Sequence, residues 1–254
     1  WIGAIHGVAS LAEGGTAIVD GDAAEVRILD SLGAHVRTLG RRGEGPLEFQ
    51  QPWIVPPEPG GGFLVFDGPL RKVVELDRYG RVRAETTHPA FAGSGNQPPV
   101  GDSGDWMLVR RQVITMPAGS GVHRMPLAWL WENLHTGDIR EIVAQESATA
   151  WVSEIPGSLA VREIPFAPRP SGVVWEERAL LTYGDAYRIE AFDLDGQLQE
   201  VFRLELPRDP VSDRDLQRYL DWMAWRFGGP AAAERLPGYA AAPIPDSLPA
   251  FASI

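Results

Sequence analysis

Side chains that could carry out nucleophilic, acid–base or metal chemistry are few and scattered along the 254 residues. None of the five histidines has a second histidine two or four residues away, the spacing that brings two imidazoles onto one metal ion. Cysteine is absent, which removes thiolate nucleophiles, thiolate metal ligands and disulfides. No Gly-x-Ser-x-Gly elbow occurs, and the adjacent Glu176 and Glu177 have the pattern of a solvated turn. These observations favour a protein without catalytic activity over an enzyme.

A glycine-rich loop beside two arginines is a candidate for binding a small anion. Gly43 and Gly45 follow Arg41 and Arg42, and the amides of such turns can cradle an oxyanion. No Gly-Lys-Ser/Thr sequence follows, and no helix is expected to begin at the loop. We therefore interpret residues 40–52 as a connection between structural units, and we retain anion binding by these four residues as the alternative.

Tryptophan supplies the remaining candidates, because the chain contains nine. Most are expected in the core, where large aromatic side chains are usually buried. Trp222 and Trp225 lie off the centre of the apolar stripe of a predicted helix. Together with Arg218 they form the candidate surface for contact with another protein.

The overall charge excludes some partners. There are 34 Asp and Glu residues against 23 Lys and Arg residues, which gives a formal net charge of −11. An acidic surface repels phosphate backbones, so we expect no binding to nucleic acid. No apolar run approaches the roughly 18 residues that a membrane-spanning helix needs, and we expect no transmembrane segment.

A short pattern repeats along the chain and predicts the elements that must position these residues. It consists of an aliphatic residue, an apolar residue three positions later, then Asp, two variable positions and Gly. Three copies align without gaps at residues 24–33, 71–80 and 187–196, and a degraded copy lies at residues 126–137. Each copy predicts a strand that ends in a tight turn. The Asp can accept hydrogen bonds from turn amides, and the Gly can adopt a positive φ.

The spacing of the turns indicates a β-propeller. The turn glycines are 47, 57 and 59 residues apart, at Gly33, Gly80, Gly137 and Gly196. One strand candidate follows each turn and others precede each hairpin, which gives four strands per unit. A β-sandwich is the competing all-β fold, but it would not explain a turn repeated at this spacing. We predict an all-β fold made of four-stranded antiparallel blades, with about four blades in the chain.

One α-helix is predicted to interrupt the strands. Ser212 and Asp215 have the spacing of a capping box, apolar residues follow at helical spacing, and Gly228 and Pro230 end the pattern. The helix is expected at residues 212–227. It lies in a Pro- and Ala-rich insertion between blades, residues 205–249. The rest of residues 1–254 is expected to form a single propeller domain that is incomplete at one or both ends.

Residues 40–52, GRRGEGPLEFQQP, resemble the start of an NHL-type repeat, G-x-x-G-x-G-P-x-x-F-x-x-P. The resemblance continues through Gly62 and Asp67 to Asp77, although Pro69-Leu70-Arg71 replaces the usual Asn-His-Arg. The chain as a whole is similar to the NHL-like six-bladed propellers of bacteria. This resemblance implies a six-bladed ring of which the chain is a part, and a periplasmic or otherwise extracytoplasmic location.

The six-bladed propellers that the chain resembles include calcium-dependent lactonases and esterases. In those propellers Glu, Asn and Asp from several blades hold a central ion. This chain has only two asparagines, Asn96 and Asn133, and Asn133 lies in the degraded turn. Asn96 is a weak candidate for a calcium ligand. We expect no cofactor, and calcium is the ion that the hydrolase alternative would require.

Three functions follow, in order of preference. The first is a non-catalytic propeller that acts as a protein-interaction, scaffold or accessory subunit of a larger or membrane-associated assembly. The second is a calcium-dependent lactonase- or esterase-like hydrolase that uses the central channel. The third is a carbohydrate-binding propeller, which needs exposed tryptophans beside carboxylates or amides.

Overall fold

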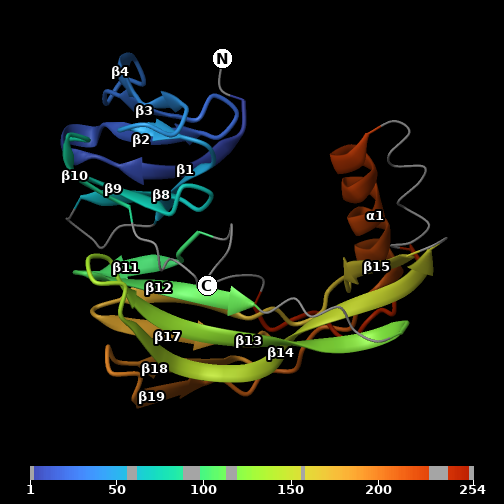
Figure 1. Cartoon of the computed structure of the whole chain (residues 1–254). Coiled ribbons are helices and arrows are strands. Elements are labelled where there is room, and N and C mark those ends of the chain that lie inside the picture. Colours follow the sequence, from blue (N-terminus) through green and yellow to red (C-terminus); the bar gives the residue numbers. More distant parts are fainter. Residues whose placement is uncertain are drawn as a thin grey trace.

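The computed structural model describes residues 3–55, 62–87, 98–112, 119–155, 158–228 and 240–251. Within them, four antiparallel sheets follow one another along the chain and are stacked like the blades of a fan (Figure 1). Strands that are consecutive in sequence pair with one another, as tight hairpins require. The chain therefore has the β-propeller fold that the repeat predicts.

Blades 1 and 2 are four-stranded meanders of short strands. Blade 1 consists of β1 (Ile5–Ser10), β2 (Thr16–Asp20), β3 (Glu25–Leu29) and β4 (His35–Leu39), with the 3-10 turn η1 (Ala12–Gly14) between the first two. Blade 2 consists of β7 (Pro52–Val55), β8 (Phe63–Asp67), β9 (Lys72–Leu76) and β10 (Val82–Thr87). A short parallel pair, β5 (Arg41–Arg42) and β6 (Glu48–Phe49), lies in the connection between the two blades.

Blades 3 and 4 follow the same order, and blade 3 has a fifth strand. Blade 3 consists of β11 (Gly101–Ser103), β12 (Trp106–Gln112), β13 (Gly121–Asn133), β14 (Ile139–Ile155) and β15 (Ser158–Glu163). Blade 4 consists of β16 (Ser171–Trp175), β17 (Arg178–Thr182), β18 (Arg188–Phe192) and β19 (Leu198–Arg203). The first strands of neighbouring blades contact one another, β1 with β7 and β11 with β16.

The four repeated turns have the geometry predicted from the sequence. In blade 1, Oδ1 of Asp30 accepts hydrogen bonds from two backbone amides of the turn, at 2.9 and 2.8 Å. Asp77 and Asp193 make the same pair of bonds in blades 2 and 4. In the degraded copy, Oδ1 of Asn133 accepts from the amides of His135 and Thr136 instead. The turn glycines have φ values of 80°, 73°, 71° and 76°, which L side chains rarely adopt.

Hydrophobic clusters between neighbouring blades form the core. The largest side chains lie between blades 3 and 4, where Trp129 and Trp131 are fully buried against Leu181 and Phe192. The indole Nε1 of Trp131 also donates a hydrogen bond to the backbone oxygen of Asp193, at 3.0 Å. These two tryptophans therefore act as wedges that fix one blade against the next.

Blade 3 differs from the other blades because two of its strands continue beyond the sheet. β12 pairs with β13 only from Leu127 to Asn133. Beyond that point the only described partner of β13 is β14, and β15 adds to the far end of β14. We call this three-stranded extension the arm; it comprises Gly121–Met125, Ala150–Ile155 and β15. In Figure 1 the arm reaches beyond the other strands of the blade, on the side where helix α1 stands.

Helix α1 (Asp213–Phe227) has the predicted boundaries and the predicted cap. Oγ of Ser212 accepts a hydrogen bond from the backbone amide of Asp215 at 3.3 Å, and the Asp215 carboxylate accepts one from the Ser212 amide at 3.1 Å. This reciprocal capping box satisfies amides that the first helical turn leaves unpaired. Among the described residues, no helix is long and apolar enough to cross a membrane.

The segment that contains α1 leaves the propeller and returns to it at neighbouring points. The backbone amide of Val211 donates to the oxygen of Asp246 at 3.2 Å, and the amide of Leu248 donates to the oxygen of Asp209 at 2.8 Å. The amide of Ala250 then donates to Gly184, next to blade 4. The helix is therefore attached through a paired stem rather than through a sheet.

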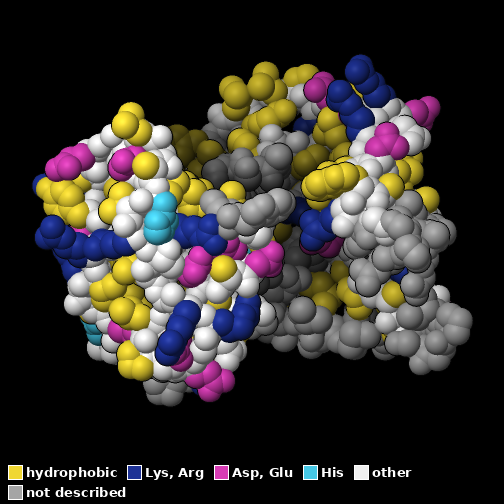
Figure 2. All heavy atoms as spheres, turned by 90° about the horizontal axis from the view of Figure 1, so that it is seen from above, with side chains coloured by type: hydrophobic (Ala, Val, Ile, Leu, Met, Phe, Trp, Pro, Cys, Tyr) yellow, Lys and Arg dark blue, Asp and Glu magenta, His cyan; other side chains and the backbone are white. Residues whose placement is uncertain are grey.

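One face of blade 1 is open to solvent. Strand alternation places Ala9, Ala17 and Val26 on the face that packs against blade 2, and it places Val8 and Val36 on the opposite face. Both of these valines are exposed. Seen from above, the surface of this part of the molecule has hydrophobic side chains among basic and acidic ones (Figure 2).

Candidate functional site

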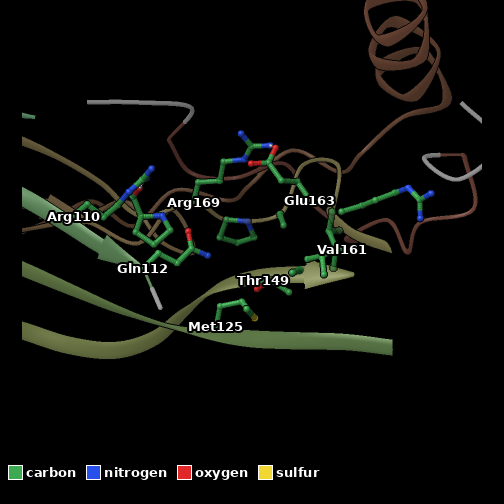
Figure 3. Close-up of a pocket in the computed structure, with 13 residues that line it drawn as sticks. Arg110, Gln112, Met125, Thr149, Val161, Glu163 and Arg169 are labelled. Atoms are coloured by element: carbon green, nitrogen blue, oxygen red, sulfur yellow. Dashed lines mark hydrogen bonds and ion pairs between the residues drawn. The ribbon is translucent and has the colours of Figure 1, made fainter. Parts of the chain in front are cut away.

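A cavity of about 240 Å³ lies where the arm meets the connection from blade 3 to blade 4. Four consecutive strands contribute to its lining, together with residues 164–170 of the connection. In Figure 3, Thr149 and Met125 lie on the strand side of the cavity, and Arg169 and Glu163 lie on the opposite side. The lining residues are Arg110, Gln112, Met125, Thr149, Ala150, Val161, Arg162, Glu163, Ile164, Ala167, Pro168, Arg169 and Pro170.

Arg110 places a cationic group in the wall of the cavity. It comes from the end of β12, and its Nη1 donates a hydrogen bond to the backbone oxygen of Pro170 at 3.2 Å. Burial lowers the pKa of the Arg110 guanidinium, while the charge of Glu163 opposes this effect and that of Arg169 adds to it. Arginine retains its proton even so. The cavity therefore contains a fixed and partly desolvated positive charge.

The rim of the cavity contains a second arginine, which is paired with a carboxylate. Nη2 of Arg169 lies 2.8 Å from Oε2 of Glu163, and both side chains are more than half exposed. An ion pair this exposed contributes little to stability and can open easily. Arg162, the third arginine of the lining, donates to Oγ of Ser153, and its guanidinium lies 5.9 Å from the ring centre of Trp151.

The lining also includes an apolar part that is shielded from solvent. Met125, Ala150, Ile164 and Ala167 are all buried, and two prolines lie beside them. The cavity therefore combines charged groups near its opening with a hydrophobic floor, which is the usual composition of a small-molecule site.

The connection that forms one wall of the cavity has an unusual backbone. Phe166 has a φ of 59°, in the left-handed region that costs a bulky residue of the order of 1 kcal/mol. Its ring lies 5.7 Å from the ring of Tyr219 in α1. Tyr219 in turn lies 6.2 Å from Trp222, measured between ring centres. Aromatic contacts therefore connect the cavity wall to the helix.

The predicted contact surface lies on α1. Trp225 is 79% exposed and Trp222 is 46% exposed, whereas Met223 of the same helix is buried. Arg218 is exposed as well, and the guanidinium of Arg226 lies 5.3 Å from the ring centre of Trp222. The helix thus brings the three predicted residues together on its solvent side. Their role in binding stays a prediction.

The chain's own carboxylate fills the glycine loop proposed for an anion. Oε2 of Glu48 accepts hydrogen bonds from the amides of Glu44 and Gly45 at 3.1 and 2.9 Å, and Oε1 is paired with Arg41 at 2.6 Å. The Gly45 amide and Arg41 lower the pKa of Glu48. Arg42, the other predicted cation, donates to the backbone oxygen of Asp22 at 2.8 Å.

The amides and the two arginines of this loop therefore serve the connection between blades 1 and 2. Nζ of the buried Lys72 reinforces it, because it donates to the backbone oxygens of Gly45 and Glu48 at 2.7 and 2.9 Å. An external anion would have to displace Glu48. Gly43 also donates its amide within the loop, to the oxygen of Phe49 at 3.1 Å. The structure favours the interpretation of residues 40–52 as a connection.

The weak calcium candidate, Asn96, lies outside the described residues. Within the residues that are described, no group of three or more histidine, aspartate or glutamate side chains could hold a metal ion. Asn133, the other asparagine, uses its Oδ1 to cap the turn of blade 3.

Sequence reasoning missed the cavity because its members are far apart in the chain. Arg110 and Gln112 are two residues apart on one strand, a spacing that places them on the same face. That is the only local signal. The two residues meet Glu163 and Arg169 because β15 runs back along β14 toward the blade and the connection that follows it passes Arg110, whose Nη1 donates to the Pro170 oxygen. Nothing in the repeat predicts this extension.

No family model matches the chain, and no curated protein is similar enough in sequence to match it. Solved structures do match. A candidate exported protein from Bacteroides fragilis superposes with a TM-score of 0.50 at 12% identity, over 91% of this chain and 57% of the other. A member of the DUF4221 family from Bacteroides vulgatus gives 0.45 at 10% identity, over 82% and 59%. Virginiamycin B lyase from Staphylococcus aureus gives 0.35 at 13% identity, over 80% and 71%.

The stacked antiparallel sheets thus define the fold as that of a β-propeller, and the first of these similarities agrees with that fold. The identities are too low to show more than the fold. The chain spans less than two thirds of the length of the first two proteins.

Proposed function

We propose that this chain is part of a non-catalytic β-propeller that binds a protein partner through helix α1. The observation that carries the proposal is the exposure of Trp222 and Trp225 on α1, which stands beside the arm of blade 3 and belongs to none of the four sheets (Figure 1). Exposed tryptophans are costly to keep in water, and interfaces are enriched in Trp and Arg.

The chemistry of the exposed face specifies the kind of partner. At 100° per residue, Arg214, Arg218, Trp222, Trp225 and Arg226 fall within a sector of about 120°. The nearby acids are already engaged. Asp215 belongs to the capping box, and Asp221 accepts a hydrogen bond from Gln217 at 2.8 Å. A basic and aromatic face on a chain of net charge −11 suits a partner with an acidic rim around an apolar pocket.

The wider setting of the chain is also part of the proposal. We infer an NHL-like six-bladed ring, on the basis of the loop at residues 40–52 and its connecting role between blades 1 and 2. An extracytoplasmic location is supported by the sequence resemblance and by the fold similarity to a candidate exported protein. In this setting the propeller would be the scaffold or accessory subunit of a larger assembly, and the helix would be its docking element.

Affinity capture with matched variants tests the proposal. The tagged chain is incubated with an extract of the source organism, and bound proteins are quantified by mass spectrometry. Trp222→Ala with Trp225→Ala, and separately Arg214→Glu with Arg218→Glu, should each remove the same bound protein. With that protein purified, each double variant should weaken the affinity at least tenfold, since buried Trp and Arg dominate interface energies.

Trp175→Ala provides the matched control, because Trp175 is 54% exposed on blade 4 and lies on a different surface. It should leave capture unchanged. Equal loss with Trp175→Ala would contradict a helix-centred interface, and so would capture that survives both helix variants. Binding should also weaken with added salt, because the arginines are exposed.

Carbohydrate binding is the second candidate, and one observation favours it. The carboxylate of Asp221 lies one helical turn before the exposed Trp225 and accepts a hydrogen bond from the side-chain amide of Gln217. A carboxylate and an amide near an exposed tryptophan are what a sugar-stacking surface requires. Tryptophan fluorescence titrations with a panel of oligosaccharides separate the two candidates. A change that saturates with a sugar and disappears in Trp222→Ala with Trp225→Ala would favour this candidate.

A further inference from the structure

We propose that the cavity between the arm and the connection to blade 4 binds a small carboxylate that has an apolar body. Its polar part would lie between Arg110 and Arg169, and its apolar part would lie over Met125, Ile164 and Ala167 (Figure 3). This inference does not depend on the partner surface of α1.

Charge is the first argument. Arg110 and Arg169 both line the cavity, and Glu163 is the single carboxylate among the lining residues that the structure describes. A guanidinium presents paired donors that fit the two oxygens of a carboxylate. Arg110 is already partly desolvated and is held in place by the Pro170 carbonyl at 3.2 Å. A ligand carboxylate would therefore meet a cation whose ordering cost has largely been met during folding.

The exposed ion pair at the rim explains how Arg169 can exchange the Glu163 carboxylate for that of a ligand. Arg169 binds Glu163 at 2.8 Å, with both side chains mostly in solvent. A ligand carboxylate can take the place of the Glu163 carboxylate on Arg169 without loss of a strong interaction. Gln112 and Thr149 also line the cavity and can donate further hydrogen bonds.

The lining distinguishes a carboxylate with an apolar body from a free phosphate. Seven of the thirteen described lining residues are apolar, and five of these are buried. An apolar body gains roughly 25 cal/mol for each Å² that it removes from water, whereas inorganic phosphate gains nothing from such a floor. The cavity of about 240 Å³ is smaller than the sites that hold drug-sized ligands, which begin near ~300 Å³. A compact acid fits this volume.

Calorimetric titration of the whole chain with defined probes tests the inference. The probes are butyrate, 3-phenylpropionate, the amide of each acid, acetate and inorganic phosphate. We expect one of the two larger acids to bind at least tenfold more tightly than its own amide and than acetate. Phosphate binding in preference to every carboxylate would overturn the proposal, and so would equal binding of acid and amide.

Three single substitutions assign the binding to this cavity. Arg169→Gln, at the exposed rim, should weaken carboxylate binding at least tenfold without affecting folding. Arg110→Gln should do the same, and its folding is checked by circular dichroism. Glu163→Gln should tighten binding two- to fivefold, because it removes the competing carboxylate. If Glu163 had only a structural role, Glu163→Gln would not be expected to tighten carboxylate binding.

Arg140→Gln is the matched control. Arg140 is an exposed arginine that pairs with Asp195 at 3.1 Å and stacks 4.1 Å from the Trp106 ring centre, on another part of blade 3. Its substitution should leave the titration unchanged. Carboxylate binding that withstands Arg169→Gln and is lost in Arg140→Gln would place the ligand elsewhere and contradict the proposal. The α1 variants should bind the probes normally, so a failure here and a failure of the partner proposal can be told apart.

Discussion

Glu132 is a buried acid whose ionisation works against folding. It lies on β13 opposite Met107, in the packed interface between blades 2 and 3, and its Oε1 is buried with no hydrogen-bond partner among the described residues. Burial raises the pKa of Glu132 to about 7, and the charge of Arg111 offsets this only in part. The unfolded chain releases the same proton at the ordinary value, 4.5. Between these two values the folded state binds more protons, so its stability falls as the pH rises.

Glu132→Gln is therefore expected to stabilise the protein at high pH. At pH 8 the free energy of unfolding should rise by about 2–3 kcal/mol, since each pKa unit corresponds to about 1.4 kcal/mol. At pH 4.5 the change should be small, because Glu132 is then neutral in the folded state. Urea denaturation of both proteins from pH 4.5 to pH 8 measures the difference. A gain that is the same at every pH would show that packing, rather than ionisation, is responsible.

At the scale of residues, the sequence predicts those features that depend only on residues close together in the chain. Asp30 and Gly33 could be assigned to a turn because the carboxylate, the amides and the glycine lie within five residues. The burial of Glu132 could not be predicted from the sequence, because acidic side chains on alternating strand positions usually face solvent. Its environment depends on how blade 2 packs against blade 3. The surroundings of Arg110 could not be predicted either, because they depend on the path of the connection to blade 4.

At the scale of elements, the cap of α1 offers a direct test of how the helix is held. The helix is attached through a paired stem, so its stability depends on its own ends more than a helix in a sheet protein usually does. Ser212→Ala removes the acceptor for the Asp215 amide and should destabilise the helix by about 1 kcal/mol. Faster hydrogen exchange at residues 213–217 would measure this loss.

The effect of Ser212→Ala should be confined to α1, because the blades have their own hydrophobic clusters. Exchange in β13 and β17 should stay unchanged. Ser10→Ala, at an exposed position of β1, is the control and should alter neither region. If hydrogen exchange instead accelerated throughout blade 4, the helix would contribute to the stability of that blade, and the expectation of a confined effect would be wrong.

Most elements of the blades were predictable, whereas the arm was not. The turns at Gly33, Gly80 and Gly196 lie between two strands as the repeat predicts, and α1 lies where its cap predicts, since turn and cap residues mark the ends of these elements. The arm has the same alternation as an ordinary strand pair, and alternation does not say where a strand loses its neighbour. The cavity lies where this extension meets the connection to blade 4. The sequence therefore predicted the helix surface and missed the pocket.

At the scale of the whole molecule, the two end blades expose faces that inner blades bury. In each inner interface, large aliphatic and aromatic side chains fill the space between two sheets. Val8 and Val36 point away from blade 2, while Trp175, Phe202 and Leu204 are exposed on blade 4. Strand pairing and alternation place Trp175 and Phe202 on the face of blade 4 that points away from blade 3. Such faces are typical of blades that have a neighbour on both sides.

The 254-residue chain on its own should consequently self-associate through these faces. Light scattering coupled to size exclusion should give an average mass that rises with protein concentration above the 27.7 kDa of one chain. Trp175→Ser with Phe202→Ser should shift the average mass toward that of the monomer, because it removes apolar area from one of the two faces without disturbing the buried core. Trp225→Ser is the matched control: it removes a more exposed aromatic ring from α1, and it should leave the mass distribution as it was. A strictly monomeric chain at every concentration would contradict the expectation that these exposed faces associate.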